Sequence, residues 1–351
     1  MSLISRIAHA SRNAHLWLPG YVASQCQRRR ILAKSGPARR LWLVIADHFE
    51  PRWKQASDEV AAVRVERWRK AWPEIADRHR DALGRKAQYT FFYPQEEYGC
   101  ELLDRLAEMR ESGVADVEVH LHHDRDSEAA FLDRLGWFLD VLSKRHGLLR
   151  KHQGKITFGF IHGNWALDNA CPDGHGCGLN NEILLLRKLG CYADFTLPAA
   201  PSAAQTRTIN TIYWAIDDPW RPRSHERGIP VTPGGREDGD LLIIPGPLGL
   251  LWKDVGRPWP KLEVGELAAN NPVTEPRVRT WLQCAPRIGE DLFLKLFTHG
   301  AQELNAQMLL AGGLDHCLRS IEKICFELQI ELCYVTAWEM RQVIDRLRQA
   351  A

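Results

Sequence analysis

The sequence has little net charge and no long apolar run. Lysine and arginine number 46 and aspartate and glutamate 44, which leaves a formal charge of +2. This balance gives no reason to expect nucleic acid or an anionic membrane as a partner. No stretch approaches the roughly 20 apolar residues that a transmembrane helix needs, so we expect no membrane span.

The cysteines and the amino terminus also lack the features of an exported protein. The nine cysteines are scattered, and only Cys171 and Cys177 have a paired spacing, so we expect reduced thiols and no disulfide. Charged residues interrupt the first forty positions, where a signal peptide needs an apolar core. We therefore expect a cytoplasmic protein.

Short apolar or alternating segments are separated by segments with helical spacing. The expected strands lie at about 41–46, 88–93, 117–122, 155–161, 192–197, 208–215, 241–245 and 291–297. Helical periodicity follows several of them, for example over 58–80, 100–111 and 128–146. This alternation predicts an α/β fold with a mostly parallel sheet. Seven or eight such units favour an irregular, TIM-like (β/α) barrel with long loop insertions.

The same pattern divides the chain into three parts. Residues 1–40 are expected to form a helical extension that packs on the outside of the fold, in preference to a peripheral membrane segment. Residues 41–300 are expected to form the barrel. Residues 301–351 are expected to form helices that pack on it.

Polar residues follow the expected strands, which is where a barrel of this type carries its functional side chains. They include Asp47 and His48, His122, His162 and His299. The densest group spans 120–126, with three histidines and two aspartates in seven residues. Imidazole nitrogens and a carboxylate oxygen are ligands that zinc accepts. A divalent metal, most simply zinc, is therefore predicted here, unless Asp126 or Ser127 merely caps the next helix.

The order of these motifs resembles that of the polysaccharide deacetylase superfamily, the NodB-like carbohydrate esterases. In that family the first strand ends in two aspartates, a base and a metal ligand, and a late histidine is the general acid. The resemblance implies Asp47 as the base, His48, His122 and Asp126 as metal ligands, and His299 as the acid. It covers roughly residues 41–300.

The chain also departs from the family pattern. His48 stands where the family has an aspartate, and Asp126 stands where it has a second histidine, so the two ligand types exchange positions. The family's arginine-containing third motif has no counterpart in the segment 162–165. An alternative register would use His120 and His123 as ligands, but neighbours three apart on a strand point to opposite faces. His120 is instead expected to orient a metal ligand from behind.

Several residues near these motifs are candidates for binding a substrate. His162, Asn164 and Trp165 directly follow a strand, and Glu96 follows another. Tryptophans in loops suit stacking on the faces of sugar rings, and they are found at Trp165, Trp220, Trp252 and Trp259. Residues 171–182 form a glycine-rich loop before an expected helix. A second zinc site is possible in this glycine-rich loop, with Cys171, His175 and Cys177 as ligands.

These observations predict a metal-dependent hydrolase that removes an acetyl or similar acyl group from a sugar or glycan intermediate. A metal-activated water, an aspartate base and a histidine acid would carry the reaction. Two alternatives stay open. One is a glycoside hydrolase that uses Asp47 with Glu96 or Glu97, and the other is a non-catalytic glycan-binding or assembly protein with the same fold.

Overall fold

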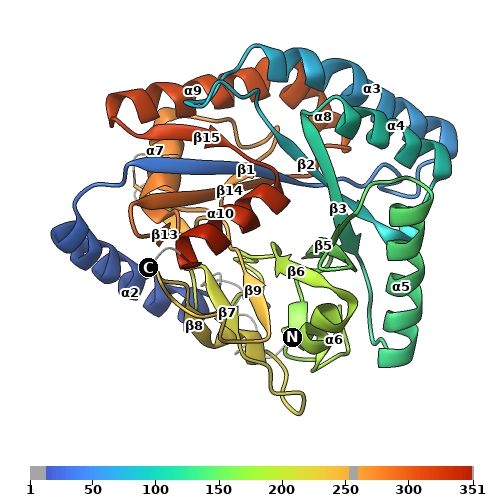
Figure 1. The fold of residues 1–351 in the computed structure, drawn as a ribbon, viewed down its shortest axis with the longest axis horizontal. Coiled ribbons are helices and arrows are strands. Elements are labelled where there is room, and N and C mark those ends of the chain that lie inside the picture. The colour runs from blue at the N-terminus through green and yellow to red at the C-terminus, as the bar shows by residue number, and fades with distance from the viewer. Residues whose placement is uncertain (1–12, 253–259, 350–351) are drawn as a thin grey trace.

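The computed structural model describes residues 13–252 and 260–349, so residues 1–12 of the predicted extension lie outside the described part of the chain. Its centre is a 13-stranded mixed sheet (Figure 1). Seven strands form consecutive parallel ladders, in the order β14, β1, β2, β3, β5, β6 and β9. They are β1 (Arg40–His48), β2 (Tyr89–Pro94), β3 (Ala115–Leu121), β5 (Lys155–His162), β6 (Cys191–Asp194), β9 (Leu241–Ile243) and β14 (Asp291–Thr298).

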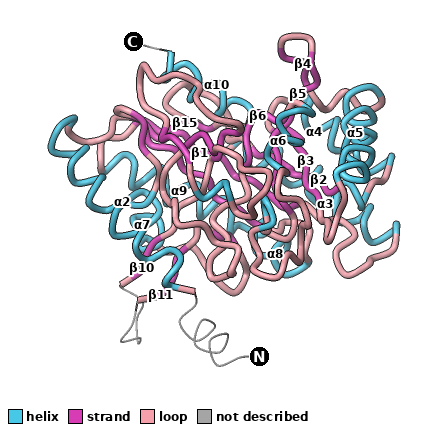
Figure 2. Tube along the Cα trace, turned by 90° about the horizontal axis from the view of Figure 1, so that it is seen from below, coloured by secondary structure: helices cyan, strands magenta, loops and turns pink. Residues whose placement is uncertain are grey.

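Shorter strands extend this sheet. Two are parallel to their neighbours: β12 (Glu266–Leu267) beside β14 and β15 (Glu331–Tyr334) beside β1. The antiparallel additions are β4 (Arg150–His152), β7 (Tyr213–Ala215), β8 (Gly228–Pro230) and β13 (Arg287–Ile288). Separate from the sheet, β10 (Gly249–Leu251) and β11 (Lys261–Glu263) form a hairpin. Figure 2 shows this hairpin at one end of the molecule and the β4–β5 hairpin projecting at another.

Helices connect most of the strands. They are α2 (Ala14–Ser35), α3 (Asp58–Asp77), α4 (Cys100–Glu111), α5 (Glu128–Lys144), α6 (Glu182–Leu189), α7 (Glu275–Cys284), α8 (Glu303–Met308), α9 (Leu314–Glu327) and α10 (Ala337–Gln349). Short helical turns are η1 (Gln95–Glu97), η2 (Leu167–Asn169), η3 (Ser224–Glu226) and η4 (Leu309–Gly313). None of the helices in the described ranges has the length and apolarity that crossing a lipid bilayer requires.

The central strands are apolar on both faces because both faces are covered. In β1, Leu41, Leu43 and Ile45 face a core that they share with the outer helices. The alternate residues of β1, among them Trp42 and Val44, face a second core on the other side of the sheet. The direction of each side chain at the end of β1 follows from the same alternation.

We call the core that contains Leu41, Leu43 and Ile45 the outer core. Helices such as α3, α4 and α9 cover it, and they line one side of the molecule in Figure 1. Two buried tryptophans of α3 anchor that helix. Trp68 Nε1 donates to the carbonyl of Gly300 at 2.8 Å, and Trp72 Nε1 donates to that of Val114 at 2.9 Å. Each indole thus fills the core while its polar atom reaches a backbone acceptor. These bonds join α3 to the ends of the strands.

We call the second core, which contains Trp42 and Val44, the inner core, and its contacts show that the sheet is strongly curved. It contains side chains from β1, β2, β5, β6, β9 and β14, together with Met340 and Ile344 of α10. Lys295 of β14 extends its ammonium group across this space to the carbonyls of Phe195 and Leu197, at 2.6 and 2.8 Å. Since β14 and β6 are not neighbours in the sheet, only strong curvature can bring them into contact.

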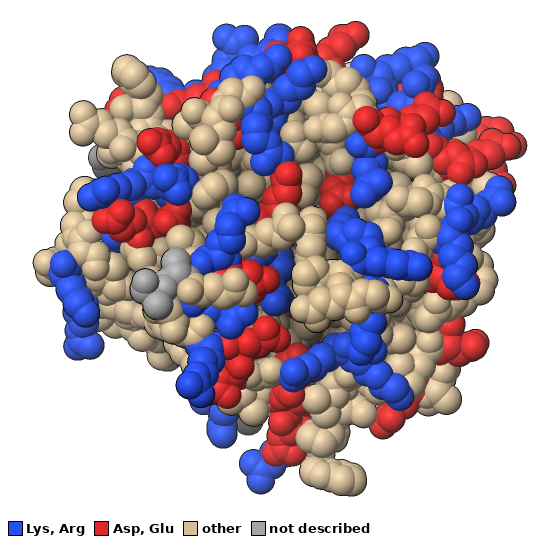
Figure 3. Space-filling model, in the orientation of Figure 1, with Lys and Arg blue, Asp and Glu red and all other residues tan. Residues whose placement is uncertain are grey.

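The predicted α/β class with a mostly parallel sheet is confirmed. Each of the eight predicted strands overlaps an observed one. Closure into a barrel stays a prediction, since no ladder in the described residues joins β12 to β8. The expectation that only helices follow residue 300 was incomplete, because β15 pairs with β1. Basic and acidic side chains are interspersed over the face shown in Figure 3, in line with the small net charge.

Candidate metal and substrate site

Four histidines lie at the carboxyl ends of parallel strands. His48 ends β1, His120 is the penultimate residue of β3, His162 ends β5, and His299 directly follows β14. The ends of parallel strands meet at one edge of the sheet. The sequence predicted polar side chains at this edge, and the structure divides them between two separate clusters.

The first cluster consists of Glu50, His120 and His122, and we call it the cavity cluster. One ligand atom from each of the three residues lies within 4.8 Å of the others, a spacing that could hold a metal ion. Glu50 Oε1 is 3.4 Å from Nε2 of His120 and 3.5 Å from Nε2 of His122. Burial opposes ionisation of Glu50, but the nearby imidazoles lower its pKa overall, so it carries a negative charge.

In each imidazole of this cluster, a hydrogen bond at Nδ1 orients the ring so that Nε2 faces Glu50. Nδ1 of His120 lies 3.1 Å from the carbonyl of Ile161, which can only accept a hydrogen bond. Nδ1 of His122 is hydrogen-bonded to the carboxylate of Glu96. In a neutral ring the proton therefore sits on Nδ1, and the lone pair of Nε2 points toward Glu50. Two nitrogen lone pairs and a carboxylate that converge in this way repel one another unless a proton or a metal ion lies between them.

His48 and His299 stand beside the cavity cluster. The His48 ring centroid is 5.1 Å from that of His120 and 4.8 Å from that of His299. Neither ring nitrogen of His48 has a hydrogen-bond partner, and Nε2 of His120 also has none. Buried polar atoms of this kind are normally paired. Burial, followed by the neighbouring imidazoles, holds the pKa of His48 well below its usual range, so the ring is neutral and able to bind a cation.

A cavity of about 690 Å³ opens next to these residues. Glu50, His122, Trp165 and His299 line it, together with Trp53. Trp165 is packed close to both His48 and His299, with ring centroids 5.5 and 5.7 Å away. Burial lowers the pKa of His299, so this side chain is neutral at pH 7. The site therefore combines a charged carboxylate, imidazole nitrogens and aromatic walls.

Asp47 lies on the other face of β1. Its carboxylate accepts hydrogen bonds from the Tyr89 hydroxyl at 3.0 Å and from Gly300 N–H at 2.6 Å. A Cβ atom on Gly300 would lie 2.2 Å from Asp47 Oδ2 and 2.6 Å from the Trp68 ring, so only glycine fits there. Burial raises the pKa of Asp47 to about 8. The predicted role of Asp47 as a base stays a prediction, but its carboxyl group faces away from the cavity.

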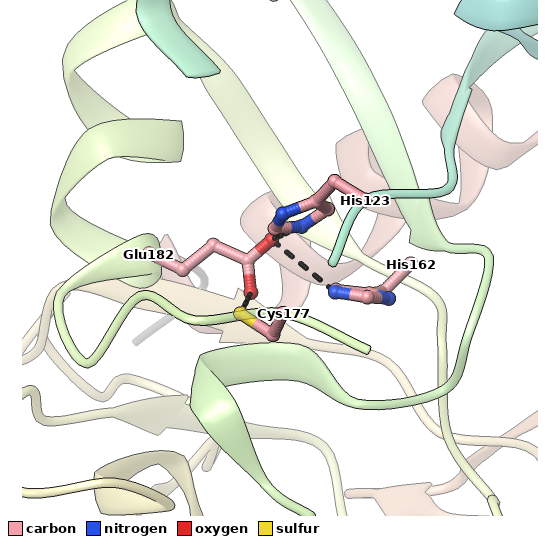
Figure 4. Close-up of side chains that lie close together, drawn as sticks. All are labelled: His123, His162, Cys177 and Glu182. Atoms are coloured by element: carbon pink, nitrogen blue, oxygen red, sulfur yellow. Dashed lines mark hydrogen bonds and ion pairs between the residues drawn. The ribbon is translucent and has the colours of Figure 1, made fainter. Parts of the chain in front are cut away.

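The second cluster consists of His123, His162, Cys177 and Glu182, and we call it the buried cluster. All four are buried, and their ligand atoms lie within 4.8 Å of one another, so the group could hold a metal ion. Figure 4 shows the Glu182 carboxylate between His123, His162 and Cys177. Neighbouring histidines lower the pKa of Glu182 to about 2 although burial opposes the shift. Burial lowers the pKa of His162 to about 3.

Asp126 belongs with this second cluster rather than with His122. Its Oδ2 is 3.4 Å from Nδ1 of His123, and it also pairs with Arg134. Ser127 caps α5 by accepting a hydrogen bond from Ala130 N–H at 3.3 Å. The structure thus brings His48, His122 and His299 together and leaves Asp126 apart. His120 and His123 also lie in different clusters, although His123 follows the end of β3 and is not part of the strand.

The predicted substrate residues are similarly divided. Trp165 lines the cavity, whereas Glu96 orients His122. His162 is part of the buried cluster, and Asn164 donates to the carbonyls of His123 and Gly176. Of the other loop tryptophans, Trp220 and Trp252 are exposed, and Trp259 lies outside the described residues. In the glycine-rich loop, Cys177 joins the buried cluster, while His175 is exposed and pairs with Asp173.

Comparisons with known proteins add no family assignment to this geometry. No family model and no curated protein matches the chain. Two ligand candidates, Glu50 and Glu182, were also missed in the sequence. Glu50 follows His48 by two residues, and that proximity is the signal that could have found it. Glu182 begins α6 a few residues after the candidate ligand Cys177, and that neighbourhood is the signal that could have found it.

Proposed function

We propose that the protein is a metal-dependent hydrolase that removes an acetyl or similar acyl group from a sugar. The observation that carries this proposal is the convergence of Nε2 of His120 and Nε2 of His122 on the Glu50 carboxylate at the edge of a cavity. The order of the strand-end motifs, which resembles that of the polysaccharide deacetylases, supports the same chemistry.

Glu50, His120 and His122 would hold the metal, and His48 is close enough to contribute. Two imidazoles and one carboxylate are a ligand set that catalytic zinc uses in proteins. A divalent metal in this position supplies Lewis acidity toward a carbonyl oxygen and lowers the pKa of water toward about 7. This assignment replaces Asp126 of the ligand set expected from the sequence with Glu50, and it makes His120, which was expected only to orient a ligand, a ligand itself.

His299 is suited to move the proton in this reaction. It lines the cavity, and its lowered pKa leaves a free lone pair at pH 7. It can therefore take a proton from the attacking water and give it to the departing amine or alcohol. Asp47 holds the Gly300 N–H that follows His299 in the chain, so we propose it as a positioning residue rather than the base.

The aromatic walls favour a sugar as the substrate. Trp165 and Trp53 border the cavity, and flat aromatic faces stack on the apolar faces of sugar rings. Asn270 and Gln302 add amide groups to the same wall. Amides of this kind can donate to and accept from sugar hydroxyls. The combination fits an acetylated amino sugar or a short oligomer of one.

Acetate release tests the proposal. The purified full chain is incubated with N-acetylglucosamine oligomers, with and without a chelator, alongside His122→Ala and the control His175→Ala, which changes an exposed histidine. We expect acetate from the untreated protein and the control, and none from the chelated protein or His122→Ala. New reducing ends without acetate would identify a glycoside hydrolase instead. Oligomer binding without either product would identify a glycan-binding protein.

A further inference from the structure

The buried cluster is closed to solvent and drawn from four segments of the chain. His123 follows β3, His162 ends β5, Cys177 lies in the glycine-rich loop, and Glu182 begins α6. The side chains of His123, His162 and Glu182 are fully enclosed, and Cys177 is buried as well. Structural zinc sites have this closed character, whereas catalytic sites keep a position open to water.

The atoms of the cluster are prearranged around one point. Glu182 Oε1 lies 2.9 Å from Nε2 of His123 and 3.7 Å from Nε2 of His162. Cys177 Sγ lies 3.3 Å from Glu182 Oε2, which also accepts Asp168 N–H at 2.8 Å. Nε2 of His162 has no hydrogen-bond partner although it is buried. Such an atom, aimed into a group of ligands, indicates an occupant that protein atoms do not supply.

A carboxylate also stands behind His123, as it does behind many zinc ligands. Nδ1 of His123 lies 3.4 Å from Oδ2 of Asp126, close to it but without a hydrogen bond between them. Metal-binding histidines commonly donate their second ring N–H to a carboxylate or a carbonyl, which fixes the tautomer that leaves the other nitrogen free. Asp126, which the sequence predicted as a metal ligand, would then orient the His123 ring without binding the ion itself.

The glycine-rich loop is already held in the position that this site needs. Asp126 N–H donates to the Cys177 carbonyl at 2.9 Å, and Gly176 N–H donates to Asp124 at 2.6 Å. Gly178 has φ +100°, and a Cβ atom there would lie 2.6 Å from the Asp126 nitrogen. The loop thus packs backbone to backbone against the segment after β3, and it delivers Cys177 to the two histidines.

We propose that His123, His162, Cys177 and Glu182 form a structural zinc site that locks the glycine-rich loop and α6 to the ends of β3 and β5. A thiolate and a carboxylate neutralise the two charges of the ion, so the buried site carries no net charge. The soft thiolate favours zinc over calcium or magnesium. Because His123 follows His122 directly, the same ion would steady the end of β3 that carries the cavity cluster.

The zinc-bound and metal-free states of the buried cluster differ in which atoms of Cys177 and His162 carry a proton. Without a metal, His162 Nδ1 accepts Asn164 N–H at 3.2 Å, and its ring proton sits on Nε2. Zinc binding releases the Cys177 thiol proton and moves the His162 proton from Nε2 to Nδ1, which breaks the contact with Asn164 N–H. The metal-free alternative keeps both protons, and Glu182 alone then accepts from its neighbours.

Cobalt spectroscopy separates these two states. The full chain is produced in cobalt-supplemented medium, and its near-ultraviolet spectrum is compared with those of Cys177→Ser, His122→Ala and Cys171→Ser. Cys171 is the matched control, because it is buried in the same loop and lies outside the cluster. We expect a thiolate-to-cobalt charge-transfer band in the wild type, His122→Ala and Cys171→Ser, and its loss in Cys177→Ser.

Zinc analysis of the same four proteins, produced without added cobalt, makes the result independent of the proposed function. We expect Cys177→Ser to contain about one equivalent less zinc than Cys171→Ser, whatever the state of the cavity cluster. A wild-type protein with no charge-transfer band would overturn the proposal even if Cys177→Ser failed to fold. So would a Cys177→Ser protein with the same zinc content as Cys171→Ser.

Discussion

Glu96 determines how the His122 ring is presented to Glu50. Its carboxylate binds Nδ1 of His122, so Nε2 faces the cavity cluster. Burial tends to lower the pKa of His122, but Glu96 and Glu50 raise it overall. The same carboxylate that would strengthen His122 as a metal ligand therefore also favours its protonation. Metal and proton compete for one nitrogen.

Glu96→Gln is expected to weaken metal binding at the cavity cluster by about 10- to 100-fold, the usual cost of losing such an orienting contact. Competition with a chelator of known affinity measures the change. Glu97→Gln is the matched control, since Glu97 occupies the same turn but accepts the backbone N–H of Arg52. Equal affinities in the two variants would show that Glu96 does not orient a metal ligand.

Asp47→Asn distinguishes a positioning role from a catalytic one. Asparagine keeps one oxygen that can accept Gly300 N–H, and its amide N–H can donate to the Tyr89 hydroxyl oxygen in the place of the second carboxylate oxygen, so we expect the rate of acetate release to fall less than about 10-fold. His299→Gln removes the proposed proton carrier and should cost about 10²- to 10⁴-fold. If Asp47→Asn is as inactive as His299→Gln, Asp47 is the base that the family resemblance implies.

At the scale of elements, the turn after β5 lies directly against the end of β3. Gly163 N–H donates to the carbonyl of Leu121 at 2.7 Å. A Cβ atom on Gly163 would lie 2.3 Å from Cδ2 of His122. That imidazole is held on its other side by Glu96 and cannot move away freely. The glycine in this turn therefore makes room for the ring of a proposed metal ligand.

Gly163→Ala is expected to displace the His122 ring and to reduce the rate by about 100-fold, as small displacements of catalytic groups do. Gly136→Ala serves as the control, because that glycine lies inside α5 with nothing near its missing Cβ atom. The control should keep its activity and gain about 0.5–1 kcal/mol of stability. Full activity in Gly163→Ala would show that His122 is not tightly placed.

Lys295 joins β14 to the end of β6 through two backbone carbonyls, and burial lowers its pKa to about 7. Between pH 7 and 10.5 the unfolded chain then holds a proton that the folded chain has released. The free energy of unfolding should therefore rise with pH over this window, by at most about 1.4 kcal/mol per pH unit.

Lys295→Met removes this titration, so its stability should rise less steeply with pH than that of the wild type. Urea denaturation at several pH values between 7 and 10.5 measures both slopes. The comparison cancels the tyrosines and cysteines that titrate in the same range in both proteins. Identical slopes would mean that Lys295 stays charged inside the sheet.

At the scale of the whole molecule, the sequence predicted the buried strands and their covering helices better than the curvature of the sheet. Apolar runs such as 41–46 and 291–297 mark buried strands wherever helices cover both faces. The strand β15 lies in a shorter apolar run, 332–335, next to helical periodicity, and its pairing with β1 completes the sheet there. The reach of Lys295 across the inner core depends on sheet curvature, which no local pattern in the sequence expresses.

The division of the histidines into two clusters was only partly predictable. The structure places His120 and His123 in different clusters, but β3 ends at Leu121, so strand alternation does not extend to His123 and is not the cause. Beyond that point the turn after β5 and the glycine-rich loop decide where each ring lies. The ligands that complete the clusters, Glu50 and Glu182, lie outside the 120–126 segment. Long-range packing therefore fixes the ligand sets, and residue spacing does not.

The zinc content of His122→Ala, measured beside that of wild type and His175→Ala, tests the central claim most directly. The account predicts that His122→Ala contains about one equivalent less zinc than either of the other two. Cys177→Ser should lose a different equivalent, so the double variant should contain almost none. If His122→Ala retains as much zinc as the wild type, the cavity cluster does not hold the metal and the proposed hydrolase loses its basis.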